Sequence, residues 1–144
     1  MKPLPHVYPV VATMSATGAV LMQARELPDV EIAPPREFDG PGDRWSPESL
    51  LVGAIASCFL LTFKAIARAS KFEWQSLHCA VDGTLERKDG VTRFTAFRTY
   101  AKLTVPATSD RTLCEHMLEK SERGCLVANS LNGERTLVME IITR

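Results

Sequence analysis

One uninterrupted apolar stretch constrains this chain more than any other feature of its sequence. The segment SPESLLVGAIASCFLLTF covers residues 46–63, and it carries no charged side chain over the fifteen residues that follow Glu48. Ser46, Pro47 and Glu48 form a helix-start signal, because a serine cap, a proline at the first helical position and an early acid all suit the exposed amide groups there. The sequence therefore predicts one long helix from Pro47 to about Ser70.

Apolar and small side chains recur along one face of this helix at steps of three and four. They are Leu50, Leu51, Ala54, Cys58, Leu61, Thr62 and Ala65. We expect this face to be buried and the helix to be central, because its small residues let another element approach the backbone closely. The apolar run is shorter than the roughly 20 residues that a membrane span needs, which argues against a membrane protein.

Segments typical of strands and turns surround the helix. Two β-rich stretches, HVYPVVATMS and AVLMQARELPDVEIAP, predict short N-terminal strands, and the proline-rich stretch PPREFDGPGDRW predicts a loop. After the helix, the dipeptide Asp89-Gly90 favours a tight turn between two long antiparallel strands. A second helix over SDRTLCEHMLEKSER, a helical turn over CLVANSLN and a closing strand over ERTLVMEIITR complete the pattern. This order predicts a single α+β domain over residues 1–144, with antiparallel strands packed on helices.

Length and charge narrow the class of protein. A chain of 144 residues suits one domain, and equal numbers of basic and acidic residues, 17 each, leave no electrostatic footprint for nucleic acid or an anionic membrane. The first residues contain no apolar segment with a small-residue cleavage site, so we expect a cytoplasmic protein whose cysteines stay reduced unless they have a chemical role. No glycine-rich nucleotide-binding motif occurs, and no cofactor is expected.

Four cysteines, at positions 58, 79, 114 and 125, are the candidate reactive groups. They form no CxxC pair, so a metal site is not expected. Cys79 and Cys114 fit buried positions on a strand and a helix. Cys125 follows Gly124 and opens a helical turn, whose N–H groups are expected to lower the pKa of its thiol. Burial alone would raise the pKa of Cys58, so this residue is either a small core residue or a nucleophile that needs a cation from elsewhere.

The segments SPESLLVGAIASCF and SERGCLVANSL, whose cysteines lie 67 residues apart, together resemble the OsmC/Ohr family of osmotically induced and organic-hydroperoxide-resistance proteins. Members typically show an Asn-Pro-Glu-Glu-Leu start, an alanine-rich turn ending in Ala-Cys-Phe, and a later Gly-Cys-Pro. Residues that match in order are Pro47, Glu48, Leu50, Cys58, Phe59, Gly124 and Cys125, whereas Ser46 replaces the asparagine and Leu126 the proline. The resemblance implies the OsmC-like fold, with antiparallel sheets packed on a long central helix that bears a cysteine, in an intertwined homodimer.

The same resemblance implies a thiol-dependent peroxidase. Cys58 would be the peroxidatic cysteine, which attacks an organic hydroperoxide, releases an alcohol and becomes a sulfenic acid, and Cys125 would resolve it as a disulfide. Electrons would come from a small or protein-bound dithiol, with dihydrolipoyl groups as the family precedent. A second interpretation of the same fold is a hydrophobic-ligand-binding or redox-sensing module in which Cys58 reacts slowly.

The family also uses a glutamate, matched here by Glu48, and an arginine that stabilises the thiolate. Ten residues of one helix place Glu48 about 15 Å from Cys58, so one helix cannot bring both to one site, and an active site shared across a two-fold homodimer is predicted. In Ohr-type members the arginine follows a Thr-Gly-Gly signature, which SATGAVL lacks. Arg36 and Arg44, in the loop before the Pro-Glu motif, are the two candidates for the OsmC-type arginine, and both stay open.

Overall fold

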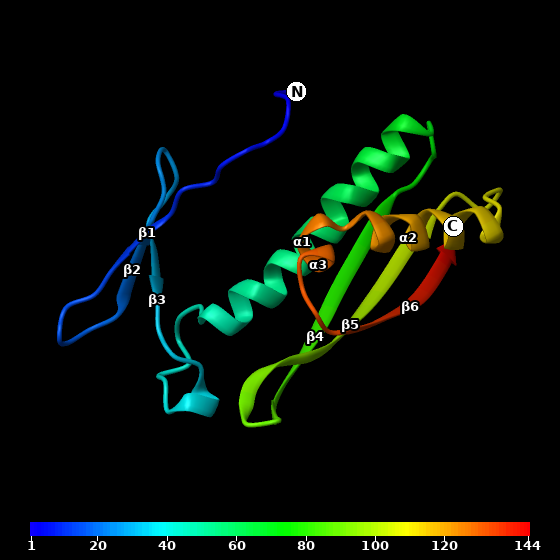
Figure 1. Ribbon diagram of the computed structural model, residues 1–144. Coiled ribbons are helices and arrows are strands. Elements are labelled where there is room, and N and C mark those ends of the chain that lie inside the picture. Colours follow the sequence, from blue (N-terminus) through cyan, green and yellow to red (C-terminus); the bar gives the residue numbers. More distant parts are fainter. The chain divides into compact units, whose positions relative to one another are not determined.

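The computed structural model describes residues 1–144, which divide into two compact units, residues 1–50 and residues 51–144 (Figure 1). The first unit contains a small antiparallel sheet in the order β1-β2-β3. Its strands are β1 (Val11–Thr13), β2 (Val20–Gln23) and β3 (Val30–Ile32). The predicted short N-terminal strands are therefore confirmed. The proline-rich segment after them is a loop that contains one short 3-10 helix, η1 (Arg36–Phe38).

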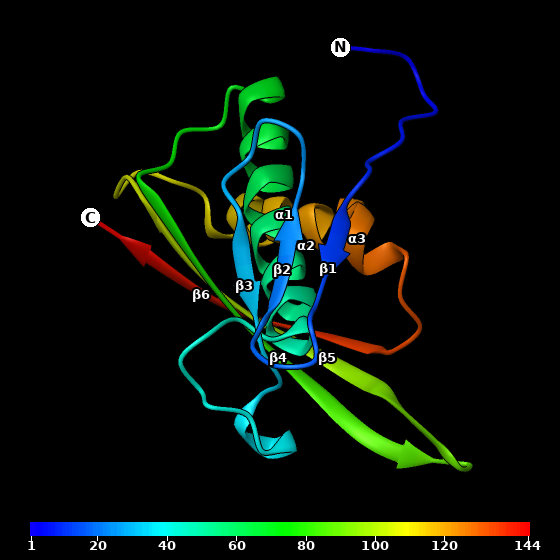
Figure 2. The ribbon, with the colours of Figure 1, turned by 90° about the vertical axis from the view of Figure 1, so that its left-hand side faces the viewer.

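A long helix leads into the second unit, where a three-stranded sheet in the order β4-β5-β6 forms the framework (Figure 2). The elements are α1 (Pro47–Ala69), β4 (Ser76–Lys88), β5 (Val91–Val105), α2 (Arg111–Gly124), α3 (Leu126–Asn129) and β6 (Glu134–Thr143). Strands β4 and β5 pair in antiparallel orientation, and β6 lies parallel to β5. The predicted α+β class with a long central helix is confirmed, but the second sheet is mixed because α2 and α3 carry the chain back before β6 begins.

The predicted helix and turn signals act as expected. The Ser49 N–H donates to the Ser46 hydroxyl oxygen at 3.1 Å, which caps α1, and the Thr112 N–H donates to the Asp110 carboxylate at 2.9 Å, which caps α2. Asp89 and Gly90 both have left-handed backbone angles, with φ of 52° and 77°. This geometry suits the tight hairpin between β4 and β5.

The main core lies between one face of the second sheet and the two longer helices. It is built from Phe59, Phe63 and Ala67 of α1, from Ala101, Leu103 and Val105 of β5, and from Cys114, Met117 and Leu118 of α2. The predicted core position of Cys114 is confirmed, since its side chain is fully buried. Both helices cover the same sheet face, which fixes α1 against the framework that also holds α2 and α3.

The buried face of α1 differs from the expected one. Its buried residues are Ile55, Phe59, Phe63 and Ala67, at regular steps of four. Leu61 on the expected face is 67% exposed, and Cys58 is half-buried. The prediction was wrong because α1 is apolar on several sides, and the large rings of Phe59 and Phe63 fill the sheet core better than the small residues do. Cys58 therefore lies on the flank of the core helix, next to the buried face.

By length and composition alone, the 23-residue helix α1 could also cross a membrane. The expectation that its apolar run is too short for a membrane span is thus wrong for the helix as a whole. Phe59 and Phe63 of this helix are fully buried against the sheet. A core helix of a water-soluble protein can have the same length and apolar composition.

Candidate active site

Two free thiols, Cys58 and Cys125, meet within residues 51–144. Cys58 comes from the middle of α1, and Cys125 occupies the corner where α2 ends and α3 begins. Cys58 packs against the buried cluster that contains Cys125, and the Cys125 sulfur lies 3.9 Å from the carbonyl oxygen of Ile55. Cys125 is fully buried, whereas Cys58 is half-buried. The packing of α1 against the α2–α3 corner therefore brings together two sulfurs that are far apart in the sequence.

The surroundings of Cys58 stabilise its thiolate. Partial burial raises the pKa of Cys58, but hydrogen bonds from the Val127 N–H, the Cys125 thiol, the Thr62 hydroxyl and the Leu126 N–H outweigh this effect and lower it. The Thr62 oxygen lies 4.0 Å from the sulfur. Hydrogen-bond donors favour the charged sulfur over the neutral one, so Cys58 ionises more readily than a free thiol.

Cys125 has the opposite character. The pKa of Cys125 is raised to about 11. Burial is the largest cause, the Ala128 N–H opposes it, and Cys58 and the negative charge of Glu122 add to the rise. The expectation that the start of α3 lowers the pKa of Cys125 was therefore wrong. Cys125 caps α3 with its backbone and makes no side-chain cap bond. The N–H groups of Leu126 and Val127 act on the sulfur of Cys58, whereas the Ala128 N–H acts on that of Cys125.

The two candidate arginines lie in residues 1–50. Arg44 forms ion pairs with Glu31, at 3.2 Å, and with Asp43, at 3.0 Å, and these pairs raise its pKa. Arg36 packs on Gly42, where a Cβ would lie 1.9 Å from the Arg36 Nε. The donors that lower the pKa of Cys58 are all neutral groups of residues 51–144, so this lowering requires no cation. The assignment of Arg36 or Arg44 to the thiolate stays a prediction.

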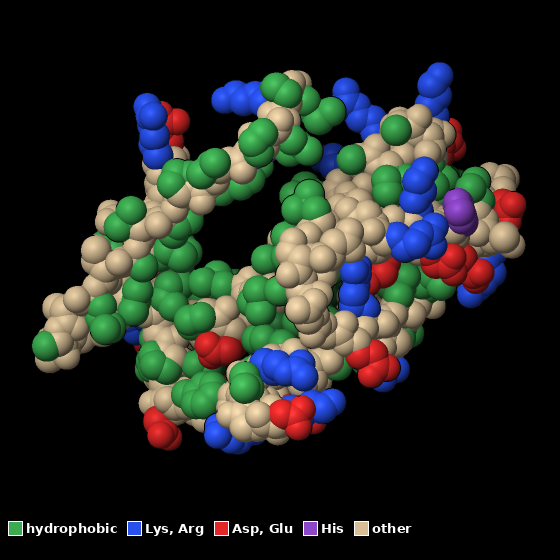
Figure 3. Space-filling view, viewed as in Figure 1, with side chains coloured by type: hydrophobic (Ala, Val, Ile, Leu, Met, Phe, Trp, Pro, Cys, Tyr) green, Lys and Arg blue, Asp and Glu red, His purple; other side chains and the backbone are tan.

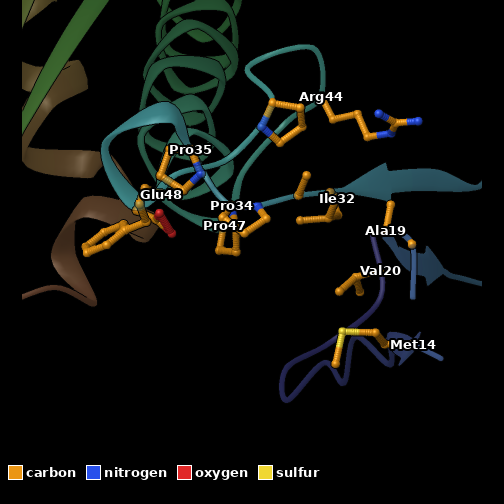
Figure 4. A pocket seen from close by; sticks show the side chains of 13 residues that line it. Met14, Ala19, Val20, Ile32, Pro34, Pro35, Arg44, Pro47 and Glu48 are labelled. Carbon is orange, nitrogen blue, oxygen red and sulfur yellow. The ribbon is translucent and has the colours of Figure 1, made fainter. Parts of the chain in front are cut away.

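Glu48 lines an apolar pocket of about 670 Å³ within residues 1–50 (Figure 4). Most of the lining is apolar, and Arg44 is the other charged residue. In Figure 4 the Arg44 guanidinium points away from Glu48. The Oε2 atom of Glu48 is buried and has no hydrogen-bond partner in the chain. A buried carboxylate oxygen without a donor is costly, so Glu48 has an unmet requirement for one.

A second pocket, of about 630 Å³, is lined by apolar residues together with Arg93 and Asn132, and the two thiols are not part of its lining. Its lining includes Phe94, Phe97 and Leu131, which pack in the same cluster as Cys58 and Cys125. The Phe94 and Phe97 rings stack at 5.5 Å. Sequence reasoning missed this aromatic wall, because two residues three apart do not normally share one face of a strand. An irregularity in the β4–β5 pairing, where Leu85 pairs with Phe94 but Thr84 pairs with Ala96, makes it possible.

The fold and the site together define an α+β protein with one thiol on a long core helix, a second thiol packed in the same cluster, and a pocket whose aromatic wall belongs to that cluster. The chain belongs to the OsmC-like protein family, whose sequence profile matches residues 40–140. This confirms the resemblance seen in the sequence.

Three relatives illustrate the similarity. The uncharacterized protein YmaD of Bacillus subtilis (strain 168) is 30% identical over 112 residues, which cover 76% of this chain and 75% of that protein. An OsmC-like protein of unknown function from Vibrio cholerae has a similar structure, with a TM-score of 0.85 and 19% identity over 94% of this chain and 99% of its own. An organic hydroperoxide resistance protein from Elizabethkingia anophelis gives a TM-score of 0.78 at 16% identity, with all of both chains covered. At such identities the structural matches show a common fold.

Proposed function

We propose that this chain is a cytoplasmic, thiol-dependent peroxidase that reduces organic hydroperoxides, with one OsmC-like domain over residues 1–144. The observation that carries the proposal is the packing of two free thiols, Cys58 and Cys125, in one apolar cluster, and the pKa of Cys58 is lowered whereas that of Cys125 is raised. A peroxidatic cysteine must be a thiolate, whereas its partner must hold a proton until the first step is complete. The pKa shifts of the two thiols have the signs that these two roles require: lowered for Cys58 and raised for Cys125.

The reaction balances with the groups of this pair. The Cys58 thiolate attacks the terminal oxygen of ROOH, the O–O bond breaks, and Cys58 becomes a sulfenic acid. The leaving alkoxide takes a proton from the Cys125 thiol and departs as an alcohol. The Cys125 thiolate then attacks the sulfenic sulfur, a disulfide forms and hydroxide leaves. A dithiol such as a dihydrolipoyl group restores both thiols by exchange and is itself oxidised to a disulfide.

The aromatic wall shared by the pocket and the cluster of the thiols supports an organic substrate. Phe94, Phe97 and Leu131 offer apolar and aromatic surface to the R group of a hydroperoxide, whereas hydrogen peroxide would gain nothing from them. Proteins of similar fold are named organic hydroperoxide resistance proteins, which agrees with this substrate class.

We also propose a homodimer in which Glu48 serves the partner's site. Glu48 and Cys58 share the continuous helix α1, which keeps them about 15 Å apart. Figure 3 shows hydrophobic side chains at the surface of residues 1–50, and exposed ones there include Val11, Met14 and Phe38. A second copy would cover this surface and supply a donor to the buried Glu48 oxygen. Arg36 and Arg44 remain the candidates for that donor and for a further contact with the thiolate.

Limiting cumene hydroperoxide, added to the reduced protein, tests the proposal. We expect rapid loss of two thiols for each molecule of peroxide consumed and no such loss in Cys58→Ser. In Cys125→Ser, Cys58 should stop at the sulfenic acid, and an excess of peroxide should carry it on to sulfinic acid, because no second thiol resolves it. Slow oxidation that spares no cysteine in particular would contradict the peroxidase and favour the ligand-binding or redox-sensing module. The matched control is Cys114→Ala, which removes a core thiol away from the pair.

A further inference from the structure

The corner that carries Cys125 is held by a side chain from another element. Arg135 belongs to the start of β6, and its guanidinium reaches across to the end of α2 and to α3. Its Nε donates to the Glu122 carboxylate at 2.7 Å, one terminal nitrogen donates to the Glu122 carbonyl oxygen at 2.5 Å, and the other donates to the Asn129 amide oxygen at 2.7 Å. One planar group thus binds both ends of the segment that contains Cys125.

Asn129 continues this connection. Its side-chain N–H group donates to the Arg123 carbonyl oxygen at 3.0 Å, so the end of α3 is tied directly to the last turn of α2. The Cys125 N–H donates to the Glu122 carbonyl at 3.3 Å, and the Asn129 N–H donates to the Cys125 carbonyl at 2.9 Å. Hydrogen bonds within residues 122–129 therefore surround Cys125, and Arg135 of β6 adds bonds to both ends of this segment.

The environment of Arg135 makes these bonds stronger than a surface ion pair. The side chains of Arg135 and Glu122 are only 26% and 16% exposed. Reduced exposure limits competition from water, and a charged, forked donor gives shorter and more directional bonds than a neutral one. Lysine could keep the charge but not the three-way geometry, because its ammonium is a point charge without the planar fork.

We propose that Arg135 is a positioning residue, which holds the α2–α3 corner so that the Cys125 sulfur and the N–H groups of Leu126 and Val127 lie against Cys58. The inference rests on the proposed function for its role in catalysis. It assigns to Arg135 no contact with the sulfurs or with the substrate. Its effect is exerted through the backbone of residues 122–129, whose first and last parts it binds.

The experiment measures the thiol pair without any peroxide. The protein is equilibrated with mixtures of reduced and oxidised glutathione, which oxidises the pair to a disulfide and yields two reduced glutathione molecules per disulfide. The fraction of the Cys58–Cys125 peptide pair that is linked is read by mass spectrometry. The resulting effective concentration of the pair reports how well the two sulfurs are held together.

We expect Arg135→Gln and Arg135→Lys each to lower this effective concentration about tenfold, which corresponds to ~1.4 kcal/mol. The matched control is Arg111→Gln, which removes an arginine from the opposite end of α2, where it pairs with Glu115 at 3.1 Å, and should leave the equilibrium unchanged. An unchanged equilibrium in both Arg135 variants would overturn the proposal. So would full retention in Arg135→Lys, since charge alone would then suffice.

A milder variant covers the case in which the Arg135 variants do not fold. Asn129→Ala removes one of the three acceptors of Arg135 from an exposed position and should shift the equilibrium in the same direction by a smaller factor. No shift in that variant would also refute the positioning role. Because no hydroperoxide is used, a protein without peroxidase activity could still show the Arg135 effect, and an active peroxidase could lack it.

Discussion

The middle of α1 and the corner between α2 and α3 each present one thiol, and the two regions treat their sulfurs in opposite ways. Cys58 lies on an apolar helix and yet has a lowered pKa, whereas Cys125 begins a helical turn and yet has a pKa raised to about 11. The difference shows that the position of donors around a sulfur matters more than the element that carries it. The first two N–H groups of α3 act on the sulfur of Cys58, and for Cys125 the effect of burial exceeds that of the Ala128 N–H.

The largest expected difference between the two regions is in alkylation. At pH 7 iodoacetamide should modify Cys58 at least about 100-fold faster than Cys125, because a thiol with a lowered pKa has far more thiolate than one with a pKa near 11. Peptide mass spectrometry over time distinguishes the two sites. Similar rates at both cysteines would remove the contrast on which the comparison depends.

A second expected difference concerns stability at alkaline pH. The folded-state pKa of Cys125 is raised above the 9.0 of a free thiol to about 11, so its contribution is fully present below pH 9 and is lost as the pH rises through about 11. The free energy of unfolding should fall by about 2–3 kcal/mol across this range for this group. Urea unfolding at several pH values measures the fall, and Cys125→Ala should reduce it.

Cys79 should also contribute to the loss of stability at alkaline pH, because burial and the negative charge of Glu122 raise its pKa to about 11. It is only half-buried, so its share of the alkaline loss should be smaller than that of Cys125. An equal loss in wild type and in the Cys79→Ala/Cys125→Ala double variant would show that other groups, such as lysines and tyrosines, cause the whole effect.

The third expected effect links the two regions. Cys125→Ala removes a donor to the Cys58 sulfur, so the pKa of Cys58 should rise and its alkylation profile should move to higher pH. A lost hydrogen bond of ~0.5–1.5 kcal/mol corresponds to alkylation about two- to tenfold slower at pH 7. A profile that does not move would mean that the α3 backbone alone sets the reactivity of Cys58.

The smallest expected effect comes from α1 itself. Thr62→Val keeps the shape of the side chain but removes the hydroxyl that lies 4.0 Å from the Cys58 sulfur. Because this contact is long, the alkylation rate at pH 7 should fall by only about twofold. A larger fall than in Cys125→Ala would reverse the order of the donors around Cys58.

Local signals in the sequence predicted much of the fold. The cap at Ser46, the turn at Asp89-Gly90 and the end of α2 at Gly124 each depend on a few neighbouring residues, and each appears where expected. The buried face of α1 and the parallel pairing of β6 depend instead on contacts with distant elements. A helix that is apolar on several sides contains no local information about which side faces the sheet.

The residues of the candidate site also fall into those that the sequence identifies and those that only the folded structure reveals. Cys58 and Cys125 could be named from the resemblance to the OsmC/Ohr family, and the structure brings their sulfurs together. Arg135 could not be named, because in the sequence it is one charged residue of a closing strand, and its three acceptors are set by the packing of β6 against α2 and α3. In our proposal the roles of Glu48 and of the two arginines require a second copy of the chain, so contacts within one chain do not specify them.

The parallel pairing of β6 with β5 has a consequence for the order of events during synthesis. Cys58 and both long antiparallel strands are made before α3, and β6 is made last of all. Until that strand docks, Arg135 cannot bind Glu122 and Asn129. If Arg135 positions the corner as we propose, Cys58 of the nascent chain should react slowly with oxidants and gain its full reactivity only when β6 has paired.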